Sequence, residues 1–332
     1  MNSAEINMTV VWLIVGFVLF NLLFLVASWF VGSYCAYTAT LRRGKGKWGR
    51  DMPSDLEPDA VRMYELGREW ARENADKKTD VHIVRDGANL YGEYYDFGGD
   101  RCAFILSGRT ESLTYGYFFA IPYARCGCNV LVVDPRGHGL SDGLYNTVGF
   151  EESRDIAAWV EHLADSFGVR SVVLHGICIG AAGGMLALTD VARTPTGEVC
   201  SRVVDGIVTE GMFANFYESV RNHMIEQHRP TFVTLDLIDL WMRHFTGHTM
   251  KYGPINVIAG LDKPLLMLHS REDLYSTPEY AEKLYERSGS EKKSLVWFDR
   301  GRHSMLRITD TELYDKSIAA FLATLPSVTA DK

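Results

Sequence analysis

Residues 171–188, SVVLHGICIGAAGGMLAL, constrain the fold of this chain more than any other stretch. Residues 172–175 favour a strand, and small helix-forming residues follow from Ala181. Between them stands GICIG at 176–180, a pentapeptide in which glycines flank Ile177-Cys178-Ile179. The order predicts a strand, a sharp turn and a helix, the form of a nucleophile elbow whose central residue is Cys178. Such a turn strains its central residue and needs small neighbours, so that strand and helix can approach each other.

Two interpretations of Cys178 follow from this stretch alone. A thiol at the first turn of a helix lies in the positive field of the helix N-terminus, which favours the nucleophilic thiolate. Free cysteines are also among the most buried residue types, so the pentapeptide could be a glycine-padded turn with an inert thiol. The rest of the chain has to decide between a working nucleophile and a packed thiol.

Composition limits the class of protein. A chain of 332 residues with 47% hydrophobic residues can form one large domain or two small ones. The net charge of −8 argues against a nucleic-acid partner, because such binding needs clustered basic residues. Six cysteines are too few for a disulfide scaffold, and C-G-C at 126–128 lacks the spacing of zinc or redox motifs. We therefore expect most of the cysteines to be reduced and packed.

The N-terminal 41 residues predict a transmembrane anchor. Residues 6–41 contain no charge, and residues 10–31 are almost continuously apolar, which is long enough to cross a bilayer. This length disfavours a buried core helix, and a signal peptide is disfavoured because Glu5 is the only charged residue before the apolar run. Aromatic residues near both ends suit the two membrane interfaces: Trp12, Trp29, Tyr34 and Tyr37.

The basic residues predict the orientation of this single span. None precedes it, and five follow it in the linker: Arg42, Arg43, Lys45, Lys47 and Arg50. The positive-inside rule then places the N-terminus outside and the following domain in the cytoplasm, a reducing compartment that suits a thiol. The same basic run could lie on anionic lipid headgroups. Residues 42–80 are expected to form this linker and a helix that starts at Ser54 or Asp55 and runs to about residue 75.

Strand and helix patterns alternate from residue 81 to residue 325, which predicts an α/β fold with a mostly parallel, doubly wound sheet. The expected strands are 81–85, 90–97, 102–106, 129–134, 171–177, 204–209, 264–269 and 293–298. The expected helices are 113–125, 150–167, 181–191, 278–287 and 310–325. A short tail, 326–332, follows the domain.

One insertion breaks the alternation at about 211–261. It is dense in aromatic, Met and His residues, among them Phe213, Phe216 and Trp241. A segment inserted after a strand lies above the carboxyl edge of the sheet, where ligands bind in α/β folds. We interpret it as a lid that lines an apolar pocket, and an ordinary packed pair of helices remains the alternative.

Three motifs in order resemble those of the α/β-hydrolase superfamily, in particular its serine-aminopeptidase-like and monoacylglycerol-lipase-like branch. Residues 132–143, VVDPRGHGLSDG, are similar to the D-x-R-G-H-G-x-S loop of this branch, and the elbow at Cys178 follows. Residues 268–273, LHSRED, resemble the strand end that carries the acid, and residues 299–303, DRGRH, the loop that carries the histidine. The resemblance covers about 81–325, and nucleophile, acid and histidine stand in the order of this fold.

The resemblance implies a role for each site residue. Cys178 would be the nucleophile, His303 its acid and base, and Asp273 the residue that orients His303. The oxyanion hole would use the backbone N–H groups of Ile179 and Arg109. Many relatives have His-Gly where this chain has Ser107-Gly108, and Gly where it has Ser270. Ser107-Gly108 in place of His-Gly changes the expected oxyanion hole little, because the hydrogen-bond donor there is a backbone N–H group.

A cysteine in place of the usual serine leaves three interpretations. Dienelactone hydrolases have a similar G-x-C-x-G elbow with a working thiol. Polyhydroxyalkanoate synthases also have a cysteine elbow, which makes an acyltransferase possible, although they lack the R-G-H-G loop. The third is a non-catalytic relative that uses the fold for binding, or a serine enzyme with a substituted elbow, and retention of Asp273 and His303 argues against decay.

From these observations we expect a membrane-anchored hydrolase that cleaves an ester or thioester of a small or lipophilic acyl group through a covalent thioester on Cys178. A peptidase is less favoured, because an amine is a poorer leaving group than a thiolate. No metal or cofactor is implied. The expected partners are a small-molecule or lipid-like acyl ester and the membrane, and the sequence carries no signal for the oligomeric state.

Overall fold

A computed structural model describes residues 3–44, 48–53, 56–189, 200 and 202–327. Its helices are α1 (Ser3–Leu41), α2 (Pro58–Glu73), α3 (Leu113–Arg125), α4 (Phe150–Phe167), α5 (Ile179–Thr189), α7 (Phe216–Glu226), α8 (Thr234–Thr246), α9 (Pro254–Val257), α10 (Pro278–Arg287), α11 (Leu306–Thr309) and α12 (Thr311–Thr324). Its strands are β1 (Lys78–Arg85), β2 (Ala88–Tyr95), β3 (Cys102–Leu106), β4 (Asn129–Val133), β5 (Val172–Ile177), β6 (Val204–Glu210), β7 (Leu265–Ser270) and β8 (Lys293–Phe298).

The strands form one eight-stranded sheet in the order β1-β2-β4-β3-β5-β6-β7-β8. β1 and β2 pair antiparallel, as do β2 and β4, and the remaining neighbours are parallel. Strands β3, β4, β5 and β6 are buried along their whole length, as expected for apolar runs covered on both faces. The mostly parallel, doubly wound α/β fold predicted from the sequence is confirmed.

Helices cover both faces of this sheet. On one face a core forms around Trp159 of α4, Met185 of α5 and Leu284 of α10. On the other face Phe118 of α3 and Ile318 of α12 pack with residues of α2. Because the parallel strands β3 to β7 all end at the same edge, the loops that follow them meet there.

The predicted helix boundaries are close to those observed. The expected cap at Ser54 or Asp55, the predicted end of the helix at 190–191 and most of the tail 326–332 lie outside the described residues. The helix after the linker begins at Pro58, since proline is favoured in the first turn. The insertion at 211–261 contains α7, α8 and α9, and a third core joins its residues to the last turns of α1.

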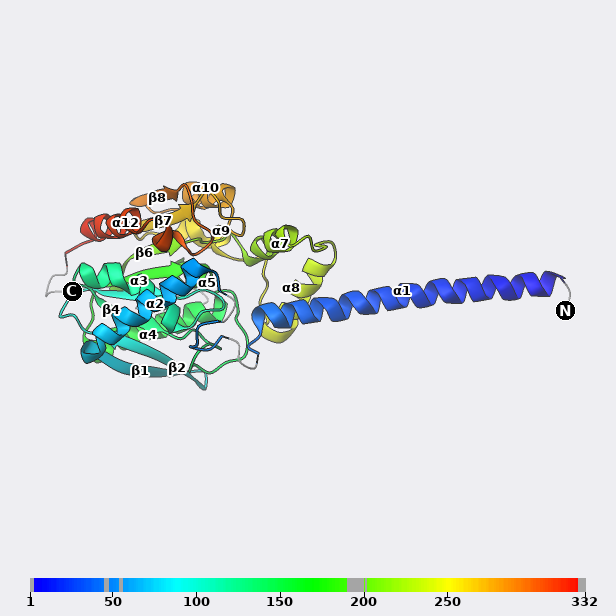
Figure 1. The fold of residues 1–332 in the computed structure, drawn as a ribbon, viewed down its shortest axis with the longest axis horizontal. Helices are drawn as coiled ribbons and strands as arrows, with labels where there is room; N and C mark the ends of the chain where they lie inside the picture. Colours follow the sequence, from blue (N-terminus) through cyan, green and yellow to red (C-terminus); the bar gives the residue numbers. More distant parts are fainter. Residues whose placement is uncertain (1–2, 45–47, 54–55, 190–199, 201, 328–332) are drawn as a thin grey trace.

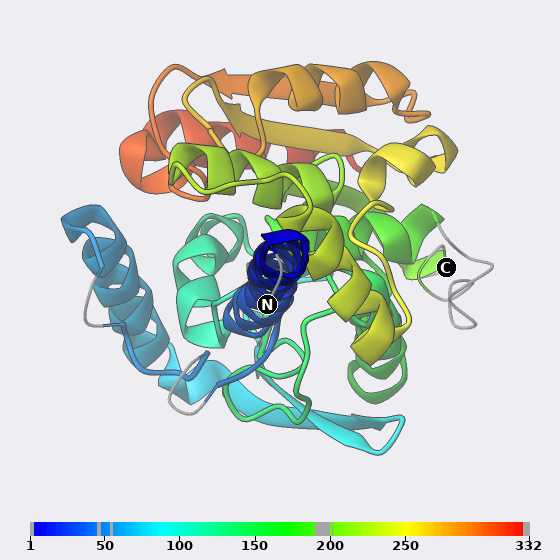
Figure 2. The same cartoon turned by 90° about the vertical axis from the view of Figure 1, so that its right-hand side faces the viewer.

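Helix α1 projects from the domain as a single long helix, with its N-terminus far from the sheet (Figure 1). Its 39 residues are about 58 Å long at 1.5 Å per residue. Residues 8–28 are exposed, and by length and composition the helix can cross a membrane. Its last turns are different, because Ser33, Tyr37 and Leu41 are completely buried against the domain. Seen along its axis, α1 stands between α8 and the α2–α3 side of the domain (Figure 2).

Candidate active site

Cys178 connects β5 to α5 in the predicted strand, turn and helix. Its φ of +52° lies in the left-handed region, which is uncommon for a residue with a side chain. The flanking glycines are required sterically. A Cβ at Gly176 would lie 2.3 Å from Ala181 Cα, and a Cβ at Gly180 would lie 2.1 Å from Leu106 O. Strand and helix can therefore meet only if both positions are glycine, and this holds Cys178 at the edge of the sheet.

His303 and Asp273 lie beside this elbow on loops that follow β8 and β7. His303 Nδ1 is 2.7 Å from Asp273 Oδ2, and Asp273 is 2% exposed. The other carboxylate oxygen, Oδ1, accepts the backbone N–H groups of Tyr275 and Ser276, both at 2.9 Å. A carboxylate with this many donors is fixed in position and can orient the imidazole.

The charges of this pair support each other. Burial opposes ionisation of His303, but the hydrogen-bonded Asp273 carboxylate and the neighbouring Cys178 raise the pKa of His303 well above its ordinary value. Burial likewise acts against the Asp273 carboxylate, and the charge and hydrogen bond of His303 lower the pKa of Asp273 nonetheless. The structure thus brings Cys178, His303 and Asp273 together in one chain of interactions.

Gly211 makes room for the imidazole. It follows β6 with a φ of +58°, and a Cβ there would lie 3.0 Å from the ring of His303. On another side the ring of Tyr275 stands edge-on to His303, with centroids 5.5 Å apart. His303 is therefore held by its surroundings and not only by Asp273.

The loop after β3 brings Arg109 to the same edge. The Gly108 N–H donates to Glu111 Oε2 at 2.9 Å, which fixes the turn from inside. The Arg109 carbonyl is hydrogen-bonded to the ring of His138, and the Arg109 guanidinium donates to Thr40 O of α1 at 3.0 Å. Ile179, the other predicted oxyanion residue, is the first residue of α5. Both proposed donors therefore belong to segments that are fixed from several sides.

The loop after β4, predicted from its D-x-R-G-H-G-x-S pattern, acts as a brace. Asp134 Oδ1 accepts the N–H of Leu113 at the start of α3 (2.9 Å), and its Oδ2 accepts the N–H of Leu140 (2.8 Å). Gly139 is required because a Cβ there would lie 2.1 Å from the Asp134 carboxylate. The loop therefore folds onto its own aspartate.

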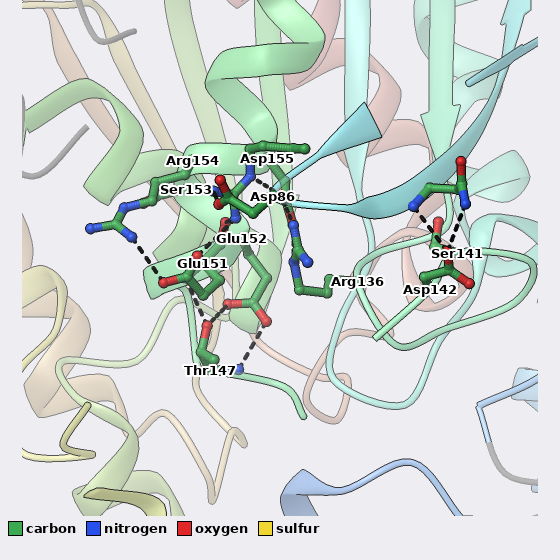
Figure 3. Close-up of polar contacts among 12 residues, drawn as sticks. Asp86, Arg136, Ser141, Asp142, Thr147, Glu151, Glu152, Ser153, Arg154 and Asp155 are labelled. Atoms are coloured by element: carbon green, nitrogen blue, oxygen red, sulfur yellow. Dashed lines mark hydrogen bonds and ion pairs between the residues drawn. The ribbon is translucent and has the colours of Figure 1, made fainter. Parts of the chain in front are cut away.

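The arginine and histidine of this loop bond to neighbouring segments. Arg136 donates two hydrogen bonds to Asp155 of α4, at 2.9 and 2.6 Å (Figure 3). His138 stacks on Trp48, with ring centroids 4.5 Å apart, and supports Arg109. His138 is also hydrogen-bonded to the Arg136 carbonyl of its own loop at 3.0 Å, so its ring joins that loop to the loop that carries Arg109.

The sequence motifs do not point to two glutamates beside the site, the buried Glu210 and the half-buried Glu111. Glu210 ends β6, and its carbonyl accepts the Cys178 N–H at 2.9 Å. Its carboxylate accepts the N–H of Leu306 (3.1 Å) and the hydroxyl of Tyr314 (2.5 Å), so one residue joins the elbow to the segment after His303. Burial raises the pKa of Glu210 to about 7, against the effect of its hydrogen bonds. An acidic residue at the end of an apolar strand was the available signal.

Glu111 is the second. It lines the pocket, and burial raises its pKa to about 7 although the Gly108 N–H and the charge of His303 act in the opposite direction. Its signal was weaker, because a single glutamate in a loop is ordinarily solvated. Among the described residues, no group of three or more His, Cys, Asp or Glu side chains is arranged to hold a metal ion.

A pocket of about 600 Å³ opens above the elbow, a size suited to a small organic ligand. Its polar floor contains Cys178 and His303, with Asp273 behind His303. We call the opposite side the apolar wall; it is formed by α1, α7 and α8 and includes Trp29, Gly32, Ala36, Phe216, Val220 and Ile238. Of the aromatic residues singled out in the insertion, Phe216 lines the pocket, whereas Phe213 and Trp241 pack behind it.

The family model for the alpha/beta hydrolase family matches residues 103–312. The chain belongs to the alpha/beta hydrolase family. This confirms the superfamily and the fold predicted from the motifs, and it makes the chain a member of a family of hydrolases. The particular branch, the role of Cys178 and the site residues remain predictions.

Individual relatives agree with this assignment. The Bacillus subtilis (strain 168) protein YqkD, described as uncharacterized, is 28% identical over 224 residues, which are 67% of this chain and 69% of YqkD. The Pyrococcus furiosus esterase Pf2001 matches with a TM-score of 0.62 and 22% identity, covering 77% of this chain and 95% of the esterase. An alpha-beta hydrolase from Vibrio vulnificus matches with a TM-score of 0.57 and 16% identity over 85% and 99% of the two chains. The structural matches show the shared fold.

Proposed function

We propose that this protein is a membrane-anchored ester hydrolase that cleaves an ester or thioester of a lipophilic acyl group through a covalent intermediate on Cys178. The observation that carries the proposal is the chain of interactions from Cys178 to His303 to Asp273 at a strained elbow. Membership of the hydrolase family and the esterase among its structural relatives support it.

The first half-reaction forms an acyl-enzyme. The Cys178 proton passes to His303, and the thiolate attacks the carbonyl carbon of the ester. The carbonyl oxygen becomes an oxyanion, which the N–H groups of Arg109 and Ile179 stabilise. His303 then gives its proton to the departing alkoxide, and the acyl group stays on Cys178 as a thioester.

The second half-reaction releases the acid. His303 takes a proton from water, and the resulting hydroxide attacks the thioester carbonyl. The tetrahedral adduct collapses, the carboxylic acid leaves, and the Cys178 thiolate recovers its proton from His303. Asp273 keeps the imidazole in one orientation and offsets its charge in both halves.

The proposal is tested with a panel of esters of increasing chain length on the full-length protein. We expect turnover and a mass increase of one acyl group on the Cys178 peptide. His303→Ala should lower turnover by about 10²-fold to 10⁴-fold, the usual value of a general acid and base. His162→Ala on α4, outside the pocket lining, is the matched control and should retain turnover.

Cys178→Ser adds a second test of the same site. A serine hydroxyl depends on a base throughout, so the Ser variant should retain activity only if His303 and Asp273 form a competent pair. If neither the wild type nor the Cys178→Ser variant turned over any ester, and no acyl adduct formed on Cys178, the proposal would be contradicted. Transfer of the acyl group to an added alcohol in place of water would indicate an acyltransferase.

We further propose that α1 anchors the protein with its catalytic domain on the cytoplasmic side. The support is the run of basic residues after the span and the absence of any before it. A reporter that is active only in the cytoplasm should function when fused after Lys332. Activity of a reporter that works only outside the cytoplasm would overturn the orientation and leave the anchor untouched.

A further inference from the structure

The last turns of α1 are part of the catalytic domain. Ser33 accepts a hydrogen bond from Trp241 Nε1 of α8 at 3.1 Å, and Trp241 packs on Phe30 with centroids 4.5 Å apart. Further along the helix, the carbonyl of Thr40 accepts a hydrogen bond of 3.0 Å from the guanidinium of Arg109, which lies in the loop after β3. The helix is therefore joined to both the lid and the loop beside Cys178.

A second face of α1 lines the pocket itself. The cavity is lined there by Gly32, which has no side chain, and by the methyl groups of Ala36 and Ala39, between Trp29 at one end and Thr40 at the other. Lid residues complete the same cavity, and Cys178 and His303 lie at its base. A helix that served only as an anchor would have no reason to line this cavity. Here its small side chains leave open the space above the thiol.

The pocket extends along α1 towards the exposed part of the helix. From Trp29 to Thr40 the helix rises about 16 Å, at 1.5 Å per residue. Residues 8–31, which lie beyond the buried turns, measure about 36 Å and match a hydrocarbon core of about 30 Å. When α1 spans a bilayer, Trp29 and the outer end of the pocket therefore lie at the membrane surface nearest the domain.

The lid presents apolar side chains at the same end of the molecule. Helix α8 packs beside α1 where it leaves the domain, and α7 packs next to α8 (Figures 1 and 2). Phe232, between these helices, is 79% exposed, and Ile225 of α7 and Leu240 of α8 are also exposed. Exposed apolar groups at this position suit contact with lipid. The surface around the outer end of the pocket thus favours the bilayer over water.

We infer that α1 is a wall of the acyl-binding site, and that the substrate is a long-chain acyl ester which reaches Cys178 directly from the bilayer. The acyl chain would lie against residues 29–40 of α1, with its carbonyl above Cys178 and its apolar end towards the membrane. This inference rests on the proposed ester hydrolysis and adds the substrate class and its route.

The inference is tested by making the cavity narrower along α1 in the full-length protein, which is reconstituted in phosphatidylcholine vesicles. Ala36→Leu and Ala39→Leu place a larger side chain in the cavity, whereas Ala27→Leu makes the same change on an exposed part of α1 that does not line it. The ratio of turnover of 4-nitrophenyl palmitate in the vesicles to that of 4-nitrophenyl acetate in solution should fall at least tenfold in the first two variants and less than twofold in the control. Equal ratios in all three would overturn the inference.

The route has its own test. Palmitate ester in the same vesicles as the protein should be hydrolysed at least ten times faster than the same amount in separate vesicles without protein. Equal rates would mean that the substrate arrives through water, and would overturn the direct route from the bilayer.

A readout without turnover separates this inference from the hydrolase proposal. Alkylation of Cys178 by N-dodecylmaleimide and by N-ethylmaleimide is followed on the Cys178 peptide by mass spectrometry. Ala36→Leu should lower the ratio of the two rates at least tenfold relative to Ala27→Leu, even if no ester is hydrolysed. An unchanged ratio, or a Cys178 that reacts with neither maleimide, would overturn the inference.

Discussion

The polar floor and the apolar wall of the pocket are built in different ways. Cys178, Asp273 and His303 stand in short turns at strand ends. Gly176 and Gly180 flank Cys178, and backbone N–H groups two and three residues further along hold Asp273. The wall joins Phe30 and Ser33 to Trp241, more than 200 residues apart in the chain. The floor is thus specified by local geometry, and the wall by tertiary packing alone.

The largest expected effect concerns the rigidity of the floor. Gly180→Ala would place a Cβ 2.1 Å from Leu106 O, so β3 or α5 must move. We expect a loss of about 3 kcal/mol or more in the free energy of unfolding, and at least a tenfold loss of ester turnover as Ile179 shifts. Unfolding of the full-length protein in detergent measures the change in the free energy of unfolding, and the ester panel measures the loss of turnover.

Gly260→Ala is the matched control, since a Cβ there meets nothing within 4 Å. Its free energy of unfolding should change by about 0.5 kcal/mol or less. If both variants were equally stable and active, the elbow would be less constrained than the structure indicates.

The next largest effect is a pH dependence of the free energy of unfolding that comes from Glu210, whose carbonyl accepts the Cys178 N–H. The pKa of Glu210 is raised to about 7, so the folded protein keeps this proton while the unfolded chain releases it near the ordinary value of 4.5. Stability therefore falls as pH rises from 4.5 to 7, by about 3 kcal/mol for this group. Glu210→Gln cannot ionise, and it should equal the wild type at pH 4.5 and be more stable at pH 8.

Denaturant unfolding at both pH values measures this difference. Glu111, whose pKa is also raised to about 7, keeps its own contribution in the variant, so part of the pH dependence remains. A variant with the same pH dependence as the wild type would show that folding does not raise the pKa of Glu210.

The floor and the wall also differ in how far the sequence predicts them. Strand and helix periodicity, with the glycines around Cys178, was enough for the fold, and the strand-end motifs were enough to predict that Cys178, Asp273 and His303 meet. Tyr34 and Tyr37 were interpreted as residues of a membrane interface, but they pack against Phe245 of the lid, with ring centroids 6.1 and 5.6 Å away. Apolar residues of an anchor and of a lid carry no pattern that pairs them, because hydrophobic contacts are not directional.

The smallest expected effect separates lining from packing within the lid. Phe216→Ala removes a ring from the pocket, so the ratio of long-chain to short-chain turnover should fall, by about 0.8 kcal/mol for each methylene that loses its contact. Phe213→Ala removes a ring that packs behind the pocket, and should lower both activities equally. Steady-state kinetics on the ester panel make the comparison, and equal losses from both variants would mean that the lid only packs.

The measurement that tests the central claim most directly is the rate at which iodoacetamide alkylates each cysteine of the full-length protein near neutral pH. Burial raises the pKa of Cys126 and raises that of Cys128 to about 11, whereas Cys178 interacts with His303 at the start of α5. We predict that Cys178 reacts faster than Cys102, Cys126 or Cys128, and that His303→Ala slows Cys178 alone. A Cys178 that reacts no faster than the exposed Cys126, and is unaffected by the loss of His303, would contradict the account.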